Sequence, residues 1–160
     1  MNLEDATIEQ LEAELERRQQ TTFDFGDGPI PAHRHINFDG RMGGWVADTA
    51  RVHRDARVHR DARVHDDAQV YEYAWIFGNA QVFGDAQVFG NAMVYDDVRV
   101  FGDAQVYGDA QVFGDAQVSG DARVSGNARV YGDAQVYGDA QVGGDAQVSG
   151  DARVSGGCLR

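Results

Sequence analysis

Basic side chains are concentrated in one stretch of the sequence, residues 51–65, which holds five arginines and three histidines. Guanidinium groups bind carboxylates and phosphates through paired hydrogen bonds, and imidazoles bind metals, transfer protons or, once protonated, attract anions. These residue types predict the binding of a small anion at this stretch. The candidate ligand-binding residues are His53, Arg54, His59, Arg60 and His65.

A six-residue repeat must position these side chains. The phrase Gln-Val-Phe-Gly-Asp-Ala, with variations, recurs without insertion or deletion from Trp45 to Cys158. A period of six is too short for a helical hairpin or a propeller blade, and it is typical of a β-helix with three short sides per coil. One coil is then three hexads, and the repeat region predicts about six coils.

Alternation within a hexad predicts which side chains face inward. In Ala104-Gln105-Val106-Tyr107 the small and branched residues share one face of the strand, and the polar and aromatic residues share the other. We expect Ala and Val inside and Gln and Tyr outside. Gly108-Asp109 then turns the corner, because glycine accepts positive φ and aspartate hydrogen-bonds nearby backbone. A core of Ala and Val is narrow, which argues against an internal ligand cavity.

The three histidines of residues 51–65 occupy equivalent outward positions on the three sides of one predicted coil. Within one subunit they should not converge on a metal or a substrate, and they would meet only across a subunit interface. A histidine that acts as a general base also needs a formed pocket around it. The segment His33-Arg34-His35 offers two imidazoles but no third ligand in register. We therefore predict no catalytic residue, no metal site and no cofactor.

Residues one coil apart stack on the same side, and this gathers apolar side chains at one place. Trp75 and Met93 stand in a column whose remaining members are Gln or Arg, and an aromatic column lies beside them. An apolar patch on a solvent face is typical of a subunit or partner interface. The stacked rings on the two remaining sides are explained by stabilisation of the solenoid itself. The candidate interface residues are Trp75, Phe77, Met93, Tyr95 and Phe113.

Corner carboxylates form a row along one edge of the predicted prism. Like charges about 4.8 Å apart repel unless they are solvated, hydrogen-bonded or bridged by a cation, so calcium binding is one interpretation. Against it, asparagine replaces aspartate at Asn79, Asn91 and Asn127, which a turn allows and a charge-driven site would resist. A second interpretation is that the acidic row imitates a nucleic-acid backbone. The row consists of Asp67, Asp85, Asp103, Asp121 and Asp139.

The overall charge and composition restrict the class of partner. The net charge is −12, whereas binding to a phosphate backbone needs a basic surface, so direct nucleic-acid binding is not expected. No apolar stretch approaches the length of a membrane span and no signal-peptide pattern opens the chain, so we expect a cytoplasmic or virion-associated protein without membrane contact. Cys158, the only cysteine, stands in an inward alanine slot, which predicts a buried and inert thiol.

Two shorter segments precede the repeats. Thr7-Ile8-Glu9-Gln10 has the form of a capping box, and Ile8, Leu11 and Leu15 recur at helical spacing. We expect a short amphipathic helix that either covers the open end of the solenoid or assembles with the same helix of neighbouring subunits. The following glycines and prolines indicate an ordered loop or linker. The predicted domains are residues 1–20, an N-terminal helix; 21–44, a loop or linker; 45–158, the β-helix; and 159–160, a C-terminal tail.

The segment Gly43-Gly44-Trp45-Val46, followed by repeats of the form Gly-Asp-Ala-Gln-Val, resembles the hexapeptide-repeat left-handed β-helix proteins of bacteriophages and prophages, of the YdcK-like type. The resemblance implies an all-β fold, a left-handed parallel β-helix solenoid that assembles as a homotrimer. The wider superfamily contains acyltransferases that use a catalytic histidine and bind acyl-CoA between subunits. Such enzymes usually interrupt the repeats with a long loop over the cofactor, and this sequence has no interruption.

These observations favour a non-enzymatic, phage-type binding or scaffold protein. In a trimer packed by the Trp75 side, the His59-Arg60 corners of three subunits would come together and hold a small anionic nucleotide signal. Sequestration of such a signal, or of a host defence protein, would be an anti-defence role. The competing hypothesis is an acyltransferase-like enzyme with a site between subunits. An acidic inhibitor that imitates nucleic acid and a virion fibre or adaptor component are also consistent with the sequence.

Overall fold

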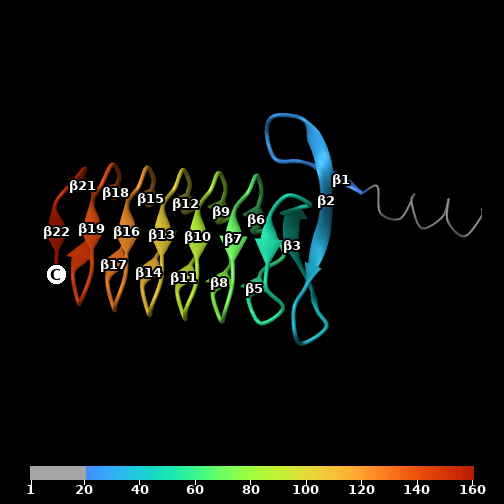
Figure 1. The fold of residues 1–160 in the computed structure, drawn as a ribbon, viewed down its shortest axis with the longest axis horizontal. Helices are drawn as coiled ribbons and strands as arrows, with labels where there is room; N and C mark the ends of the chain where they lie inside the picture. The colour runs from blue at the N-terminus through green and yellow to red at the C-terminus, as the bar shows by residue number, and fades with distance from the viewer. Residues whose placement is uncertain (1–20) are drawn as a thin grey trace, which may run out of the picture.

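A computed structural model describes residues 21–160, and in this range the chain forms a parallel β-solenoid of short strands. Figure 1 shows the coils stacked side by side along the long axis of the molecule. The helix predicted over residues 1–20 lies outside the described residues. No helix in the described range has the length and hydropathy of a membrane span.

The strands differ in length between the two ends of the described chain. The first three are β1 (Thr22–Asp24), β2 (Pro29–Ile36) and β3 (Met42–Ala47). Every later strand has two residues, because each hexad supplies one outward and one inward residue before the next corner. These strands are β4 (Arg51–Val52), β5 (Arg57–Val58), β6 (Arg63–Val64), β7 (Gln69–Val70), β8 (Trp75–Ile76), β9 (Gln81–Val82), β10 (Gln87–Val88), β11 (Met93–Val94), β12 (Arg99–Val100), β13 (Gln105–Val106), β14 (Gln111–Val112), β15 (Gln117–Val118), β16 (Arg123–Val124), β17 (Arg129–Val130), β18 (Gln135–Val136), β19 (Gln141–Val142), β20 (Gln147–Val148), β21 (Arg153–Val154) and β22 (Cys158–Leu159).

Three sheets form the three sides of the prism. The first runs β1-β2-β3-β6-β9-β12-β15-β18-β21, the second β4-β7-β10-β13-β16-β19-β22, and the third β5-β8-β11-β14-β17-β20. Gln87 pairs with Gln105 and Val88 with Val106, so that residues three hexads apart are neighbours in the sheet. The predicted coil of three hexads is therefore confirmed.

The core is built from two residue types, as the alternation predicts. The inward alanines and valines of the coils between Ala56 and Val142 are fully buried, and Ile76 is the largest side chain among them. Alternating a methyl group with an isopropyl group fills a narrow prism with no space for a ligand. Binding must therefore take place on the outside of the solenoid.

The corners depend on glycine for two reasons. Gly108 has a φ of 74°, which side chains rarely tolerate, and the remaining corner glycines from Gly78 to Gly150 also have positive φ. The corners also stack so closely that a Cβ on Gly90 would lie 2.8 Å from the backbone nitrogen of Gly108. Both constraints explain why the sequence keeps glycine at this slot through the regular coils.

Three acidic residues take positive φ where glycine is absent. These are Asp66, Glu72 and Asp96, with φ between 57° and 62°. The carboxylate of Asp66 accepts a hydrogen bond from the backbone N–H of Gly84 at 3.1 Å, and that of Asp96 accepts one from Gly114 at 3.2 Å. The bond to the next coil offsets part of the steric cost of the left-handed conformation. Arg54 and Arg60 also replace corner glycines, but neither has positive φ, so the corners of the first coil have a different backbone path.

Residues 21–44 are not the predicted loop or linker. They form β1, β2 and the start of β3, an antiparallel meander that we call the N-terminal cap. β3 then pairs in parallel with β6, which joins the cap to the solenoid. Phe23 stacks on Trp45 with ring centroids 4.6 Å apart, and Phe25 stacks on His65 at 4.7 Å. The glycines and prolines indicated a loop, but tertiary contacts with the first coil organise the segment into strands.

Steric crowding explains why two glycines stand at the junction of the cap and the solenoid. A Cβ on Gly43 would overlap the carbonyl oxygen of Val58, and a Cβ on Gly44 would overlap those of Ala62 and His59. These oxygens belong to the backbone and cannot move away without distorting the coil. Gly43 and Gly44 therefore allow β3 to lie directly against the first coil.

The last coil departs from the six-residue register. Cys158 pairs with Gln141, one residue earlier than the period requires, and its side chain is exposed. The prediction of a buried, inert thiol was therefore wrong, and the regular hexads end before Cys158. The shift places Leu159, rather than the charged Arg160, in register with Val142, and Leu159 is itself exposed at this open end.

Candidate functional site

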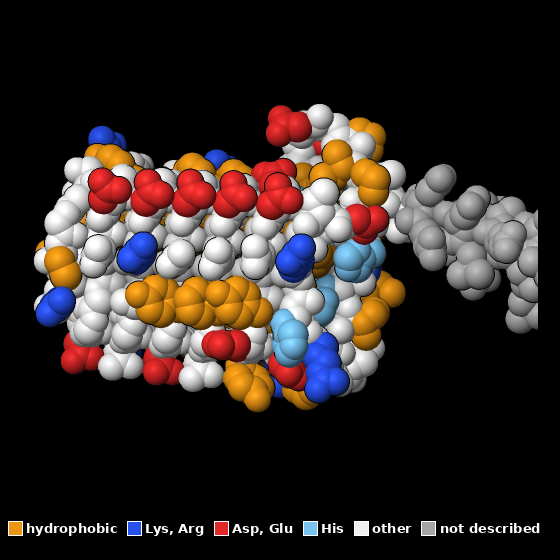
Figure 2. All heavy atoms as spheres, viewed as in Figure 1, with side chains coloured by type: hydrophobic (Ala, Val, Ile, Leu, Met, Phe, Trp, Pro, Cys, Tyr) orange, Lys and Arg blue, Asp and Glu red, His pale blue; other side chains and the backbone are white. Residues whose placement is uncertain are grey.

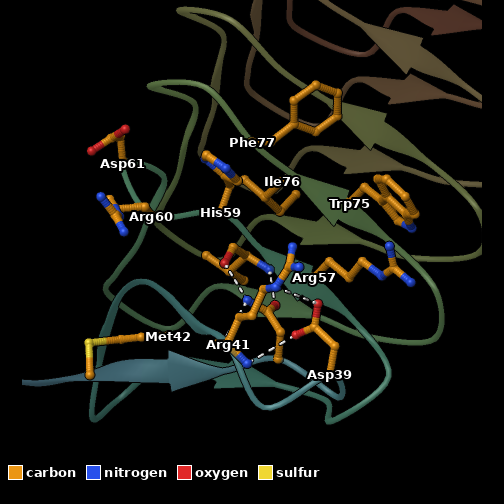
Figure 3. Close-up of a pocket in the computed structure, with 12 residues that line it drawn as sticks. Asp39, Arg41, Met42, Arg57, His59, Arg60, Asp61, Trp75, Ile76 and Phe77 are labelled. Atoms are coloured by element: carbon orange, nitrogen blue, oxygen red, sulfur yellow. Dashed lines mark hydrogen bonds and ion pairs between the residues drawn. The ribbon is translucent and has the colours of Figure 1, made fainter.

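A cavity of about 780 Å³ lies on the outside of the solenoid where the N-terminal cap meets the first two coils. We call it the N-terminal cavity. Its walls come from the loop between β2 and β3 and from β5, β8 and the corner between β5 and β6 (Figure 3). The lining residues are Asn37, Asp39, Arg41, Met42, Arg57, Val58, His59, Arg60, Asp61, Trp75, Ile76 and Phe77.

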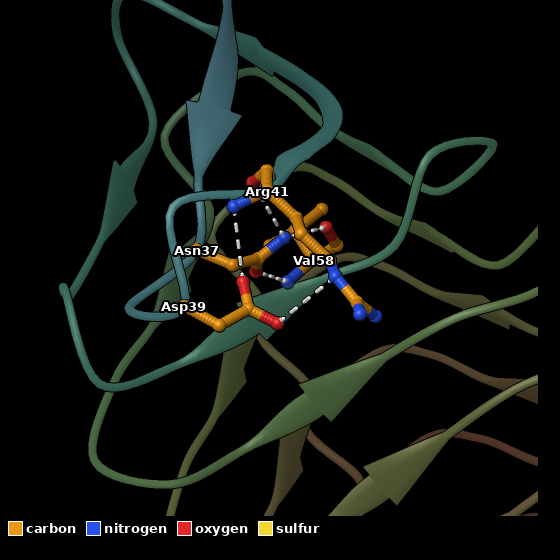
Figure 4. A network of polar contacts seen from close by, with 4 residues as sticks. All are labelled: Asn37, Asp39, Arg41 and Val58. Carbon is orange, nitrogen blue, oxygen red and sulfur yellow. Dashed lines mark hydrogen bonds and ion pairs between the residues drawn. The ribbon is translucent and has the colours of Figure 1, made fainter.

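Asn37 fixes the loop of the cap to the solenoid. Its side-chain amide donates to the carbonyl of Val58 at 3.2 Å, and its side-chain oxygen accepts from the N–H of Val58 at 3.0 Å. The amide thus acts as one rung of a sheet on the otherwise free edge of β5. Within the loop, the carboxylate of Asp39 accepts from the N–H of Arg41 at 3.1 Å (Figure 4). One wall of the cavity is therefore held by specific hydrogen bonds.

Arg57 is the most constrained cation of the cavity. Its guanidinium carbon lies 4.3 Å from the ring centre of Phe38 on the cap and 4.2 Å from that of Trp75 on β8. Both distances are within the range of a cation–π contact, so two aromatic rings hold the guanidinium group in place. No ion pair joins Arg57 to a carboxylate within residues 21–160. The group is held rigidly and keeps donors free for an anion.

The charges around the cavity are unequal. Arg41, Arg57 and Arg60 line it, against Asp39 and Asp61. Among the residues that the structure describes, only Arg41 of these three arginines has an ion pair, a weak one with Asp39 at 3.8 Å. The side chain of Arg41 is 87 % exposed, so water screens this ion pair. The cavity is a locally cationic place on a strongly acidic protein.

The structure brings together only two of the five predicted ligand-binding residues. His59 and Arg60 line the N-terminal cavity with Asp61 (Figure 3). His53 lies on another side of the prism, where it borders a smaller hollow of about 370 Å³ with Arg51. The expected divergence of the histidines onto separate sides is confirmed.

Two more of the predicted ligands face a carboxylate on their own corner. Nδ1 of His53 lies 3.5 Å from Asp55, and Nε of Arg54 lies 3.8 Å from the same side chain. Arg54 is 87 % exposed and does not line the N-terminal cavity. Neither residue contributes to that cavity in one subunit.

The prediction that His65 binds a ligand conflicts with its position. Its ring is stacked between Phe25 of the cap and Phe83 of the next coil, with centroids 4.7 Å and 4.9 Å away, and the side chain is 12 % exposed. Burial lowers the pKa of His65 below its ordinary value, although the nearby Asp66 carboxylate acts in the opposite direction. His65 is a structural member of an aromatic column that continues to Phe101.

His33 and His35 do not form a chelating pair. A β-bulge between Arg34 and Ile36 shifts the alternation of β2, so that His33 is exposed and pairs with Asp48 at 2.9 Å, while His35 is buried. Burial lowers the pKa of His35. No group of three or more potential metal ligands is found within residues 21–160.

The predicted interface residues form one contiguous surface beside the cavity. Phe77, Tyr95 and Phe113 stack in a column that continues to Tyr131, with centroids 4.7–5.0 Å apart and rings parallel within 5°. Trp75 pairs in register with Met93 and meets Phe77 edge-on. The stacking covers much of each ring, and Trp75 is the most exposed of the five at 39 %. Their role in an interface stays a prediction.

The corner asparagines have a specific role. The amide of Asn79 donates to the carboxylate of Asp97, as do Asn91 to Asp109 and Asn127 to Asp145, all at 3.0–3.1 Å and one coil apart. Each asparagine thus replaces a repulsive pair by a hydrogen bond. The edge from Asp67 to Asp139 has no asparagine, and Figure 2 shows the resulting line of acidic side chains along one edge.

Sequence reasoning did not identify several residues of the cavity. Arg57 belongs to the basic stretch of residues 51–65 and to the column of Trp75 but was not among the predicted ligand-binding residues, and the loop residues were assigned to a linker. The sequence Asn37-Phe38-Asp39-Gly40 between two alternating segments is a hairpin signal, because Asp-Gly favours a tight turn. That signal would have placed Phe38, Asp39 and Arg41 beside the first coil.

Comparison with known proteins identifies the repeats. The family model described as YdcK β-solenoid repeat matches residues 86–102, 104–120, 116–132, 122–138, 128–144 and 146–160. No curated protein matches the chain. The matched residues lie in the later coils of the solenoid, where the Gly-Asp-Ala phrase recurs with few substitutions. Within residues 86–160 the chain is therefore similar to the YdcK β-solenoid repeats.

Proposed function

We propose that the chain is a non-enzymatic binding protein whose N-terminal cavity holds a small anionic ligand with a planar ring, of the nucleotide class. The observation that carries the proposal is the position of Arg57 between Phe38 and Trp75. A guanidinium fixed in this way loses little entropy when it binds a phosphate through two hydrogen bonds. The surrounding aromatic faces supply a surface on which a base can stack.

The size and composition of the cavity support a ligand of this class. Its volume of about 780 Å³ lies within the range of small-molecule sites, roughly 300–1,000 Å³. Arg41 and Arg60 stand near Arg57 and provide further positive charge for a second phosphate. His59, at the same wall, adds a hydrogen-bond donor.

The proposal is tested by isothermal titration of the full chain with cyclic dinucleotides and nucleoside phosphates. We expect Arg57→Gln to weaken binding by about tenfold or more, because it removes a charged hydrogen-bond donor pair. Arg129→Gln is the matched control, since Arg129 occupies the same outward slot on β17, two coils beyond Met93 in the same sheet. Absence of heat with every nucleotide, or equal loss in both variants, would refute the proposal.

We further propose the finer features of the assembly. The coils are left-handed, the protein is of phage type, and three copies pack through the surface that contains Trp75, Phe77 and Met93. This packing would bring three N-terminal cavities close to one axis and extend the site across subunits, in the host cytoplasm or on the virion. Native mass spectrometry of the protein purified from its own host would report the subunit number and any retained ligand. A monomeric spectrum would contradict the assembly.

An acyltransferase-like enzyme is the second candidate. It is favoured by the position of His59 on the wall of the cavity, where the imidazole is accessible to a substrate. A general base in such a place needs a partner surface that excludes water, which a second subunit would have to supply. Acyl-CoA turnover that is unchanged in His59→Ala would remove this candidate.

A further inference from the structure

The surface around the N-terminal cavity exposes an unusual amount of apolar side chain. Seven large hydrophobic residues in the described range are exposed, and five of them gather at this end of the molecule. Their exposed fractions run from 39 % for Trp75 to 64 % for Tyr73. We call this surface the apolar rim. It consists of Ile36, Phe38, Met42, Tyr73 and Trp75.

The apolar rim includes residues of both the cap and the second coil. Ile36 and Met42 are direct partners across the β2–β3 hairpin. Phe38 follows in the loop and meets Trp75 through the shared guanidinium of Arg57. An apolar surface with cations at its centre fits a partner that is itself amphipathic and acidic.

The described chain begins beside β2, the strand that carries Ile36 of the rim. β1 runs antiparallel to β2, with Asp24 opposite Pro29 and Thr22 opposite Pro31, and the N–H of Ala32 donates to the carbonyl of Thr21. Thr21 therefore lies beside Ala32, and the path along β2 from Ala32 to Ile36 covers four residues. That path is about 13 Å at the usual rise per strand residue. The six residue steps from Leu15 to Thr21 span about 14 Å if the first three are helical and the rest extended, which is enough.

The sequence before Thr21 has the complementary chemistry. Ile8, Leu11 and Leu15 recur at helical spacing and make one apolar stripe. The same segment is acidic, whereas the cavity within the rim is lined by Arg41, Arg57 and Arg60. The acidic residues of the segment are Glu4, Asp5, Glu9, Glu12, Glu14 and Glu16.

We propose that residues 1–20 dock on the apolar rim of their own subunit, with the stripe of Ile8, Leu11 and Leu15 against Ile36, Phe38 and Met42 and with glutamates facing the arginines of the cavity. The proposal concerns the regulation of the site proposed above and rests on that proposed function. An acidic segment in this place competes with an anionic ligand for the same guanidinium groups. Ligand binding then displaces the segment, and the segment suppresses binding of weak anions.

Disulfide trapping in the full chain tests the docking. In a Cys158→Ser background, Leu11→Cys is combined with Met42→Cys or with Ile36→Cys, and oxidation is followed by non-reducing electrophoresis. A disulfide forms only when the two Cα atoms approach within about 7 Å, so it reports proximity. We expect an internally linked monomer to form roughly tenfold faster than in a control that pairs Leu11→Cys with Tyr137→Cys, an exposed position near the far end of the prism.

A second set of variants keeps the test decisive. Adding Ile8→Glu and Leu15→Glu should reduce the rate of trapping to that of the control. Trapping no faster than the control at both Met42 and Ile36, or products linked only between two chains, would overturn the proposal. The experiment needs no ligand, so its failure leaves the nucleotide proposal intact. Failure of nucleotide binding likewise leaves a positive trapping result standing.

Discussion

The two ends of the solenoid share one six-residue repeat but differ in their corner residues and in what covers them. In the coils after Val98, glycine stands at every corner in left-handed conformation up to Gly150, and the outer faces carry Gln, Arg, aromatic and Ser side chains. In the first coil the corner glycines are replaced by Arg54 and Arg60, and the cap lies on top of the coil. The cavities of about 780 Å³ and 370 Å³ are both at this irregular end.

The contrast between the two ends distinguishes residues that hold neighbouring coils together from residues that could bind a ligand. A solenoid gains stability from contacts between neighbouring repeats, so regular coils can be extended without acquiring a site. A site needs departures from the repeat, because side chains on a straight prism diverge. Here the departure is the cap, whose loop brings Phe38 to within cation–π distance of Arg57. Function is expected where local rules are broken.

The largest test of this comparison is a pair of glycine substitutions. Gly44→Ala places a methyl group against backbone oxygens of Ala62 and His59, so we expect a loss of about 3 kcal/mol in the free energy of unfolding and separation of the cap. Gly150→Ala, at φ 61° with no neighbouring atom, should cost about 1 kcal/mol through its conformation alone. Urea unfolding measures both. Equal losses would show that the cap is no more tightly packed than an open corner.

The second-largest expected loss of stability comes from removing the hydrogen bonds of Asn37. Asn37→Ala leaves the N–H and the carbonyl of Val58 without their side-chain partners, and we expect a loss of about 2 kcal/mol. Amide hydrogen exchange should speed up in residues 37–41 and at Val58. Asn127→Ala, which removes one exposed bond in a regular coil, is the control and should change exchange only locally. Unchanged exchange at Val58 would contradict the anchoring role.

The two buried histidines predict a pH dependence that is confined to the capped end. Burial lowers the pKa values of His35 and His65 below 6.5, so the unfolded chain takes up protons first as the pH falls. The stability that they contribute is full above about pH 6.5 and is lost below it. The charged groups near His65 are Asp66, Arg63 and Asp27, and burial outweighs the two carboxylates.

His65→Phe sharpens this prediction. Phenylalanine continues the column of Phe83 and Phe101 and cannot be protonated, so the variant should lose less stability between about pH 7.5 and pH 5 than the parent protein. Phe101→Leu, which changes the same aromatic column without removing a titratable group, is the control and should keep the slope of the parent. The urea midpoint at the two pH values is the measurement. An unchanged slope in His65→Phe would show that this imidazole is not held neutral by the fold.

The regular coils were predictable because each hexad carries the same information. Ala104 and Val106 are inside and Gln105 and Tyr107 outside by alternation alone, and the structure agrees. The cap was not predictable in this way. Its strands depend on contacts with residues far along the chain, such as Trp45 with Phe23, and Gly26, Gly28 and Pro29 gave a stronger local signal for a loop.

The site was predictable in part for the same reason. The eighteen-residue spacing of stacked positions placed Trp75 beside Phe77 and put His59 and Arg60 at one corner. All four residues line the N-terminal cavity. The opposite wall comes from the cap, so its residues were missed. Cys158 was misplaced because the period was extended one hexad too far, past the point where the pairing register shifts by one residue.

The smallest expected change in the free energy of unfolding comes from substitutions on two different edges of the prism. Asn91→Asp replaces a hydrogen bond to Asp109 by a pair of like charges one coil apart, and we expect a loss of about 0.5 kcal/mol that shrinks in roughly 1 M salt. On the unbroken acidic edge, Asp103→Asn should have the opposite sign, because its amide can donate to Asp121 as Asn91 does to Asp109. Urea unfolding of both variants at low and high salt is the measurement. If Asp103→Asn destabilises the protein instead, then the carboxylates of this edge make a stabilising interaction that outweighs their mutual repulsion. A bound cation is then the first explanation to test.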